Sequence, residues 1–317
     1  MARGSFAQIL RRAAGALAAA FGASILIWML IPLAPGDPAF RILQAQGVLD
    51  PTAEEVAEVT ELYGLDRPLP EQYSIWASGV LRGDLGISYQ SGRPVIQEMQ
   101  QRLPATVRLT VATLAIALLI SVAAALIAAR WRNQWPDSLL RVFAFLTAAL
   151  PAFLIGFIIL EFVVVRGEWG AVIGDGTWAG VWLPALALSL GVFATWSRLL
   201  RSDLIVAQGK RFALTLRARG LTEGRILTRH ALPVAAPSFL HAVGLGIGAI
   251  LSGAPVIEAV FTWPGLGSYA VQAVSARDMP VIQGYAIYAT LVYVASSLAA
   301  DIAAAAIDPD ADPDRVR

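Results

Sequence analysis

The sequence has 317 residues, of which 57% are hydrophobic and only 15% are charged. Soluble domains carry about a quarter charged residues, so the composition indicates a membrane protein, and a net charge of +1 argues against a nucleic-acid partner. With no cysteine and only His230 and His241, the chain offers no disulfide, no thiol nucleophile and no histidine-rich metal cage.

Six apolar segments reach the length of about 20 residues that a helix needs to cross the hydrocarbon core. They are Ala13–Leu33, Ala105–Ala129, Leu139–Val165, Val181–Leu200, Ala231–Ile257 and Val281–Ile307. The first run is longer than the roughly 7–15 apolar residues of a signal peptide, which favours a retained helix over a cleaved signal. Abundant alanine and glycine predict closely packed spans. The fold class expected is an all-α membrane protein with six transmembrane helices.

Between the first two spans, residues 34–104 are expected to form a small helical extracytoplasmic segment. Thr52 followed by Glu54 and Glu55 predicts a helix start, because acidic groups favour the positive end of a helix, and Gly64 would end that helix. Further helices are expected over Pro70–Leu81 and Pro94–Arg102. A plain linker is the alternative, but it would not need the recurring aromatic residues Tyr63, Tyr73, Trp76 and Tyr89.

Basic residues in the short loops give the orientation. If the N-terminus is cytosolic, arginines concentrate in the inner segments, whereas the short outer loops hold only Arg166 and Arg277. The sequence therefore predicts a multi-pass membrane protein with both termini in the cytosol.

The inner segment 201–230 is too basic to enter the bilayer and too long for a simple turn. Apolar residues recur between its charges, and Gly220 interrupts them, which predicts two short helices that meet near Gly220. Such a segment can lie on lipid headgroups, or it can dock into a partner protein. Gly220 itself either permits close approach of a partner backbone or simply ends a helix.

Three acids fall within the apolar spans, where a charge usually faces a cavity or a partner. Glu161 is close enough to Arg166 to pair with it, and Asp301 can snorkel or pair with a neighbouring basic residue. Glu258, at the outer end of the fifth span, either faces such a cavity or partner or is an interfacial residue.

Residues 217–233 resemble the cytoplasmic signature loop of ABC importer permeases. The resemblance rests on Gly220 and, at a fixed distance, Leu232-Pro233; the acidic residue and alanine pair expected upstream are replaced by Leu214, Thr215 and Leu216. It assigns ATPase coupling to the residues Arg217, Ala218, Arg219, Gly220, Leu221, Glu223, Leu232 and Pro233.

Other stretches resemble the dipeptide/oligopeptide/nickel branch of that family, and together they cover nearly the whole chain. They include residues 35–39, 63–69, 83–88, 103–106, 256–267 and 277–283. The outer loop 259–280 would face the binding protein, or serve only as an interfacial aromatic anchor. The residues assigned to the outer gate or this contact are Glu258, Phe261, Trp263, Pro264, Gly265, Gly267 and Asp278.

The resemblance implies the type I importer fold and a place in the bacterial cytoplasmic membrane. It divides the chain into residues 1–33, the outer segment 34–104, a five-helix core over 105–307 and a cytosolic tail, 308–317. The partners implied are a second homologous permease, two ATPase subunits, an extracytoplasmic solute-binding protein and membrane lipid. The chain itself would bind no cofactor, with ATP and Mg on the ATPase subunits.

The residues independently argue against an ATPase, because the only lysine, Lys210, has no glycine-rich phosphate loop around it. No catalytic constellation indicates a membrane enzyme. An ion-coupled secondary transporter would need a proton or ion relay and internal repeats, which are not visible. The solute stays open between peptides and nickel or metal chelates; residues 131–137 and 209–211 resemble the nickel-type members.

Overall fold

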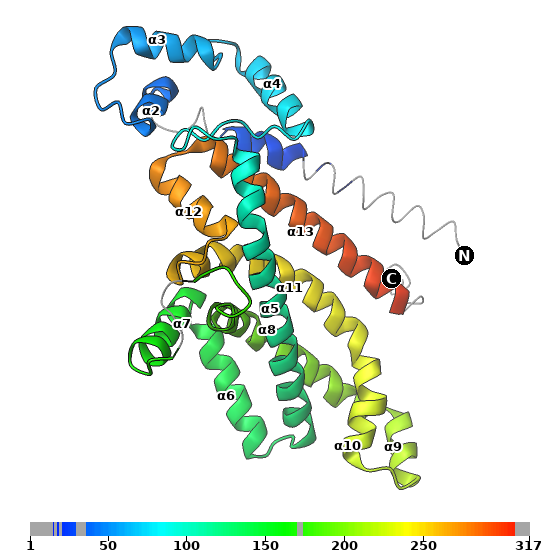
Figure 1. Cartoon of the computed structure of the whole chain (residues 1–317). Helices are drawn as coiled ribbons and strands as arrows, with labels where there is room; N and C mark the ends of the chain where they lie inside the picture. The colour runs from blue at the N-terminus through cyan, green and yellow to red at the C-terminus, as the bar shows by residue number, and fades with distance from the viewer. Residues whose placement is uncertain (1–14, 16–17, 19–20, 30–35, 170–173, 308–317) are drawn as a thin grey trace. The chain divides into compact units, whose positions relative to one another are not determined.

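The computed structural model describes residues 15, 18, 21–29, 36–169 and 174–307 (Figure 1). Over these residues the chain is helical and contains no β-strand, only an isolated bridge between Ile87 and Pro94. The chain divides into two compact units. The first comprises Met1–Pro104 and Gly265–Val294, and the second comprises Ala105–Pro264 and Ala295–Arg317.

The first unit holds three short helices in its N-terminal part, α2 (Pro38–Ala45), α3 (Ala53–Leu62) and α4 (Leu69–Leu81). Thr52 and Glu55 form a capping box at the start of α3, in which each side chain bonds the other residue's backbone N–H. These hydrogen bonds from Thr52 lower the pKa of Glu55. The helix expected after Thr52 and the one expected over Pro70–Leu81 are therefore confirmed.

A small apolar core joins α2 to α3. Ala39, Ile42 and Leu43 on α2 are buried against Val59 on α3. Asp37 caps α2 by accepting a hydrogen bond from the Ala39 N–H at 2.8 Å. This packing shows that residues 38–62 form an organised segment, as the aromatic pattern predicted.

The helix α5 (Val95–Arg130) corrects one boundary. A helix over Pro94–Arg102 and a separate span from Ala105 were expected, but the structure has one helix of 36 residues with Pro104 inside it. Proline is common in the first turn of a helix, which made Pro104 resemble a start. Inside a helix it removes one backbone hydrogen bond, a defect that membrane helices tolerate.

The remaining helices of the first unit are α12 (Leu266–Ala276) and the beginning of α13 (Met279–Ile307). Val95 and Met99 of α5 pack with Leu266, Tyr269 and Ala273 of α12, together with Val281 of α13. This core fixes α12 beside the first turns of α5 and thereby positions the polar groups between them.

The second unit contains the rest of α5 and the helices that follow it: α6 (Trp135–Ala149), α7 (Ala152–Ile159), the π-helix η1 (Leu160–Val165), α8 (Trp182–Gln208), α9 (Arg211–Ala218), α10 (Glu223–Ile226), the π-helix η2 (Leu227–Ala231) and α11 (Leu232–Val260). The packing of α8 on α11 is close at Gly246, where an added Cβ would lie 2.5 Å from the Trp196 ring. Small residues thus permit the tight helix packing that composition predicted.

The expected third span, Leu139–Val165, is not one straight helix. The chain bends by 106° between Trp135–Ala149 and Ala152–Val165. Leu150, which precedes Pro151, has φ −96° and ψ 129°. A residue before proline is disfavoured in the helical region, which explains why α6 ends here. Hydropathy alone does not reveal this break, because apolar residues continue through it.

Among the described residues, four helices are long and apolar enough to span a membrane, or five if the bent pair counts as one span. The first expected span, Ala13–Leu33, lies largely outside the described residues, of which 21–29 are helical. The side chain of Asp301 is likewise outside them. Glu161 pairs with Arg166 at 2.8 Å, as predicted.

Candidate functional site

The two short helices predicted around Gly220 are present, and Figure 1 shows α9 and α10 together at one end of the second unit. Gly220 has φ +81°, in the left-handed region. Its N–H donates to the Arg217 carbonyl at 2.9 Å, and the Leu221 N–H donates to the Leu216 carbonyl at 3.1 Å. These two bonds form a Schellman motif that ends α9. The conformation of this turn alone is therefore enough to require glycine.

A bidentate ion pair braces the same turn. The Arg217 guanidinium donates to the two carboxylate oxygens of Glu223 at 2.6 and 3.1 Å, and also to the Gln208 carbonyl at 3.2 Å. The Glu223 carboxylate raises the pKa of Arg217. Both side chains are about one-third exposed, so we expect the pair to contribute about 1 kcal/mol or less. Its role is to fix α10 relative to α9.

Buried apolar residues hold this element onto the rest of the second unit. Ala213, Ile226, Leu227 and Ala231 are all almost fully buried. Since α10, η2 and α11 follow one another without a break, Glu223–Val260 forms a continuous helical rod of 38 residues, with Pro237 and Pro255 inside α11. A force on the α9–α10 turn therefore acts directly on the long membrane helix. The hydrophobic pattern alone did not predict the π-helical turn that leads into Leu232-Pro233.

Beside the turn lies an open groove, referred to below as the α9–α11 groove. It is lined by Phe212, Thr215, Leu216, Arg219, His230 and Val234. Its lining is mostly apolar, with Arg219 as the one arginine. Of the residues assigned to coupling, Arg219 lines the groove, Arg217 and Glu223 brace it, Gly220 and Leu221 shape the turn, and Ala218 ends α9. Leu232 and Pro233 form the first turn of α11.

Of the outer residues, Glu258, Phe261, Trp263 and Pro264 belong to the second unit. Glu258 is fully buried, and the Thr106 hydroxyl donates to its Oε1 at 2.8 Å. The Trp263 N–H donates to the Glu258 carbonyl at 2.7 Å, and the Trp263 indole N–H donates to the Ala105 carbonyl at 3.0 Å. Glu258 thus joins the Ala105–Thr106 turn of α5 to the end of α11.

Phe261 and Pro264 contact the segment that precedes α8. The Gly174 N–H donates to the Phe261 carbonyl at 3.0 Å, and an added Cβ at Gly176 would lie 2.9 Å from Pro264. Phe261 is buried and Pro264 is exposed. A role for Glu258 in a gate stays a prediction, since these contacts equally serve to hold α5 and α11 together.

The other outer residues, Gly265, Gly267 and Asp278, belong to the first unit. Gly265 precedes α12, and Gly267 is buried in its first turn. Asp278 is also buried and accepts hydrogen bonds from the Ser88 hydroxyl at 2.5 Å and the Gln90 N–H at 3.2 Å. Ser88 and Asp278 are 190 residues apart in the chain, which is why sequence reasoning did not find the pair.

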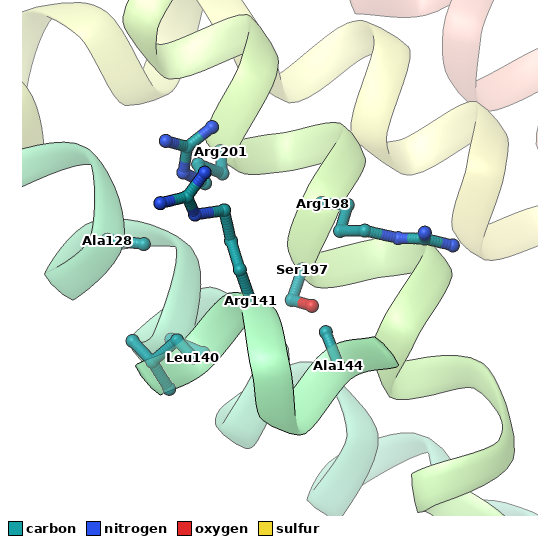
Figure 2. A pocket seen from close by; sticks show the side chains of 8 residues that line it. Ala128, Leu140, Arg141, Ala144, Ser197, Arg198 and Arg201 are labelled. Carbon is teal, nitrogen blue, oxygen red and sulfur yellow. The ribbon is translucent and has the colours of Figure 1, made fainter. Parts of the chain in front are cut away.

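A buried ion pair between α6 and α8 was also not predicted. Asp137 is fully buried and receives two hydrogen bonds from the Arg201 guanidinium, both at 2.7 Å, and one from the Asn133 N–H. Figure 2 shows a small cavity nearby, with Arg141 and Arg201 at one end and Ser197 beside Ala144. The Ser197 hydroxyl has no hydrogen-bond partner among the described residues.

These elements define a multi-pass, all-helical membrane protein, with a braced turn and groove at the end of a long membrane helix. Residues 121–312 match the family described as binding-protein-dependent transport system inner membrane component. Residues 5–110 match the N-terminal part of the membrane components of such systems.

Curated relatives indicate the same family. The chain is 34% identical over 301 residues to the glutathione transport system permease protein GsiC of Escherichia coli O6:H1, covering 95% of this chain and 97% of the relative. The GsiC proteins of E. coli K12 and Shigella dysenteriae serotype 1 are 33% identical over the same shares. The chain therefore belongs to the family of binding-protein-dependent inner membrane components, and it is an ABC importer permease of the peptide/nickel branch.

Proposed function

We propose that this chain passes a small peptide-like solute across the cytoplasmic membrane, driven by ATPase subunits that dock in the α9–α11 groove. The observation that carries the coupling part is the groove itself. It is exposed and mostly apolar, and it lies beside a turn fixed by the Schellman bonds and by the Arg217–Glu223 pair.

The geometry supports transmission of force. A partner helix in the groove would contact α9 and the first turn of α11 at once, through Thr215 and Val234. Because the rod of which α11 is part is continuous over 38 residues, closure of the ATPase dimer would move it and change its tilt or rotation. Close approach of a partner backbone at Gly220 stays a prediction, since the turn alone already accounts for the glycine.

The groove is tested by filling it. We expect Thr215→Trp, which projects a ring into the groove, to weaken ATPase association at least tenfold in a pull-down from detergent. Leu214→Trp is the matched control, because Leu214 is the preceding, exposed residue of α9 and does not line the groove. If Thr215→Trp retains both ATPase association and ATP-driven uptake, docking in this groove is wrong.

For the solute, the relatives' name favours a peptide-like compound of the size of glutathione. A nickel or metal chelate is the second candidate, supported by the resemblance of residues 131–137 and 209–211 to nickel-type permeases. Uptake into proteoliposomes that contain the whole complex, with radiolabelled glutathione, a tripeptide and a nickel–histidine chelate compared in parallel, separates these solutes.

The assembly proposed contains a second homologous permease, two ATPase subunits that carry ATP and Mg, and an extracytoplasmic binding protein. Both termini lie in the cytosol, and six spans in the type I importer arrangement complete this permease. Support comes from the positive loops, whose basic residues gather around 201–230, and from the family, whose name states dependence on a binding protein.

A further inference from the structure

The first unit contains a polar cavity of about 200 Å³ that the proposed function does not use. Three segments build its wall: the turn that carries Ser88, the first turns of α5 with Glu98 and Arg102, and α12 with Tyr269 and Gln272, followed by Asp278. The apolar core of Val95, Met99, Leu266 and Val281 fixes these segments relative to one another. The cavity is therefore part of the folded unit.

The position of Asp278 is fixed by its backbone as well as by its side chain. α12 ends at Ala276, and Arg277 follows with φ +57°. The Asp278 N–H then donates to the Ala273 carbonyl at 2.8 Å. This left-handed turn places Asp278 in the wall of the cavity, where its Oδ2 accepts the bonds from Ser88 and Gln90.

The other carboxylate oxygen, Oδ1, has no hydrogen-bond partner among the described residues, although Asp278 is only 1% exposed. A buried carboxylate oxygen without a donor is unfavourable, because it has lost its hydrogen bonds to water and gained none in the protein. Burial of this kind persists when a ligand or an ordered water supplies the missing donor.

The charges around the cavity favour a cation with one positive charge. Asp278 and Glu98 contribute two negative charges and Arg102 one positive charge, so the wall is negative by one. The Arg102 guanidinium lies over the Tyr269 ring, 4.6 Å from its centroid, so it is already engaged. Burial, followed by the nearby Glu98 carboxylate, raises the pKa of the Tyr269 hydroxyl, and the hydroxyl therefore remains a neutral donor.

We propose that this cavity binds a primary ammonium group through Asp278 Oδ1. A primary ammonium carries three N–H donors and one positive charge. It can therefore donate to Oδ1 and also balance the single net negative charge of the cavity wall. A divalent metal fits poorly, because Arg102 lies in the wall and, among the described residues, no three acidic or histidine side chains are grouped to hold one. The ammonium has two possible sources, a lysine side chain of the binding protein or the amino group of the solute.

The probe is butylammonium, measured by isothermal titration calorimetry on the purified complex in detergent. We expect saturable binding that falls at least tenfold in Asp278→Asn, because the amide retains an acceptor for Ser88 and puts an N–H₂ group, which cannot accept from an ammonium, in place of Oδ1. Tetramethylammonium, a cation without N–H groups, should not bind. Asp84→Asn is the control, since Asp84 is an exposed acid of the same unit outside the cavity.

Glu98→Gln is the second variant, in case Asp278→Asn does not fold. Glu98 is only half-buried, so this variant should fold. Loss of the Glu98 charge should weaken butylammonium binding several-fold. No butylammonium binding to the wild-type complex, equal binding of tetramethylammonium, or unchanged binding in both variants would overturn the site.

Two further experiments distinguish the two sources of the ammonium group. Only these two experiments rest on the proposed function. If the source is a lysine of the binding protein, Asp278→Asn weakens its docking to the complex. If the source is the solute, docking is unchanged, and the wild-type preference for a free over an acetylated peptide amino group disappears in the variant. ATP-driven uptake by the wild-type complex is measured in the same preparation, so failure of the cavity and failure of the permease function are distinguishable.

Discussion

At Gly220 the left-handed backbone conformation, rather than the space around it, sets the residue type. An added Cβ would meet no atom within 4 Å at either Gly220 or Gly224, but only Gly220 has a positive φ. We expect Gly220→Ala to destabilise the turn by about 1–2 kcal/mol and to reduce ATP-driven uptake, whereas Gly224→Ala should leave uptake unchanged. Uptake into proteoliposomes is measured for both variants. Equal effects of the two substitutions on uptake would contradict this explanation.

Substitutions of Glu258 can distinguish a role in a gate from a role in helix packing. Because Glu258 is fully buried and accepts the Thr106 hydroxyl, Glu258→Ala should lower the free energy of unfolding by about 1–3 kcal/mol. Glu258→Gln retains an acceptor for the Thr106 hydroxyl and should therefore lower the free energy of unfolding by less. Thermal unfolding in detergent is the measurement. Lost transport in Glu258→Ala with unchanged thermal stability would instead favour the gate.

Between elements, the Asp137–Arg201 ion pair joins α6 to α8. Asp137→Ala leaves the guanidinium without its carboxylate, and because Arg201 is 20% exposed we expect a loss near the lower end of the range for buried pairs, about 3 kcal/mol. Arg141→Ala is the control, since Arg141 lies 3.8 Å from Asp137 and is half-exposed, and it should change stability by about 0.5 kcal/mol or less. Chemical denaturation in detergent compares the stability of the two variants. Equal losses of stability would contradict the role assigned to the Asp137–Arg201 pair.

Sequence patterns predicted those elements whose signals are local. The capping residues Thr52 and Glu55, the two helices around Gly220 and the pair Glu161–Arg166 all depend on residues a few positions apart. Hydropathy measures how apolar a segment is but not its direction, so the bend before Pro151 was not predicted. Contacts between distant residues, such as Ser88 with Asp278, have no signal in a single sequence.

For the molecule as a whole, the orientation can be measured without background labelling because the chain has no cysteine. Ser91 and Thr228 are both exposed, one in the proposed outer segment and the other next to the proposed coupling turn. In intact cells, a membrane-impermeant maleimide should label Ser91→Cys. It should label Thr228→Cys only after the membrane is permeabilised. The opposite pattern would reverse the topology.

The central proposal is that ATPase subunits dock in the α9–α11 groove. Thr215→Cys places a single thiol in the groove, and Ser91→Cys places one in the other unit. In the assembled transporter, we expect a short bifunctional crosslinker to join position 215 to an ATPase subunit, with an efficiency that changes when ATP is added, and not to join position 91 to it. Absence of any ATPase crosslink from position 215, both with and without ATP, would contradict the proposal.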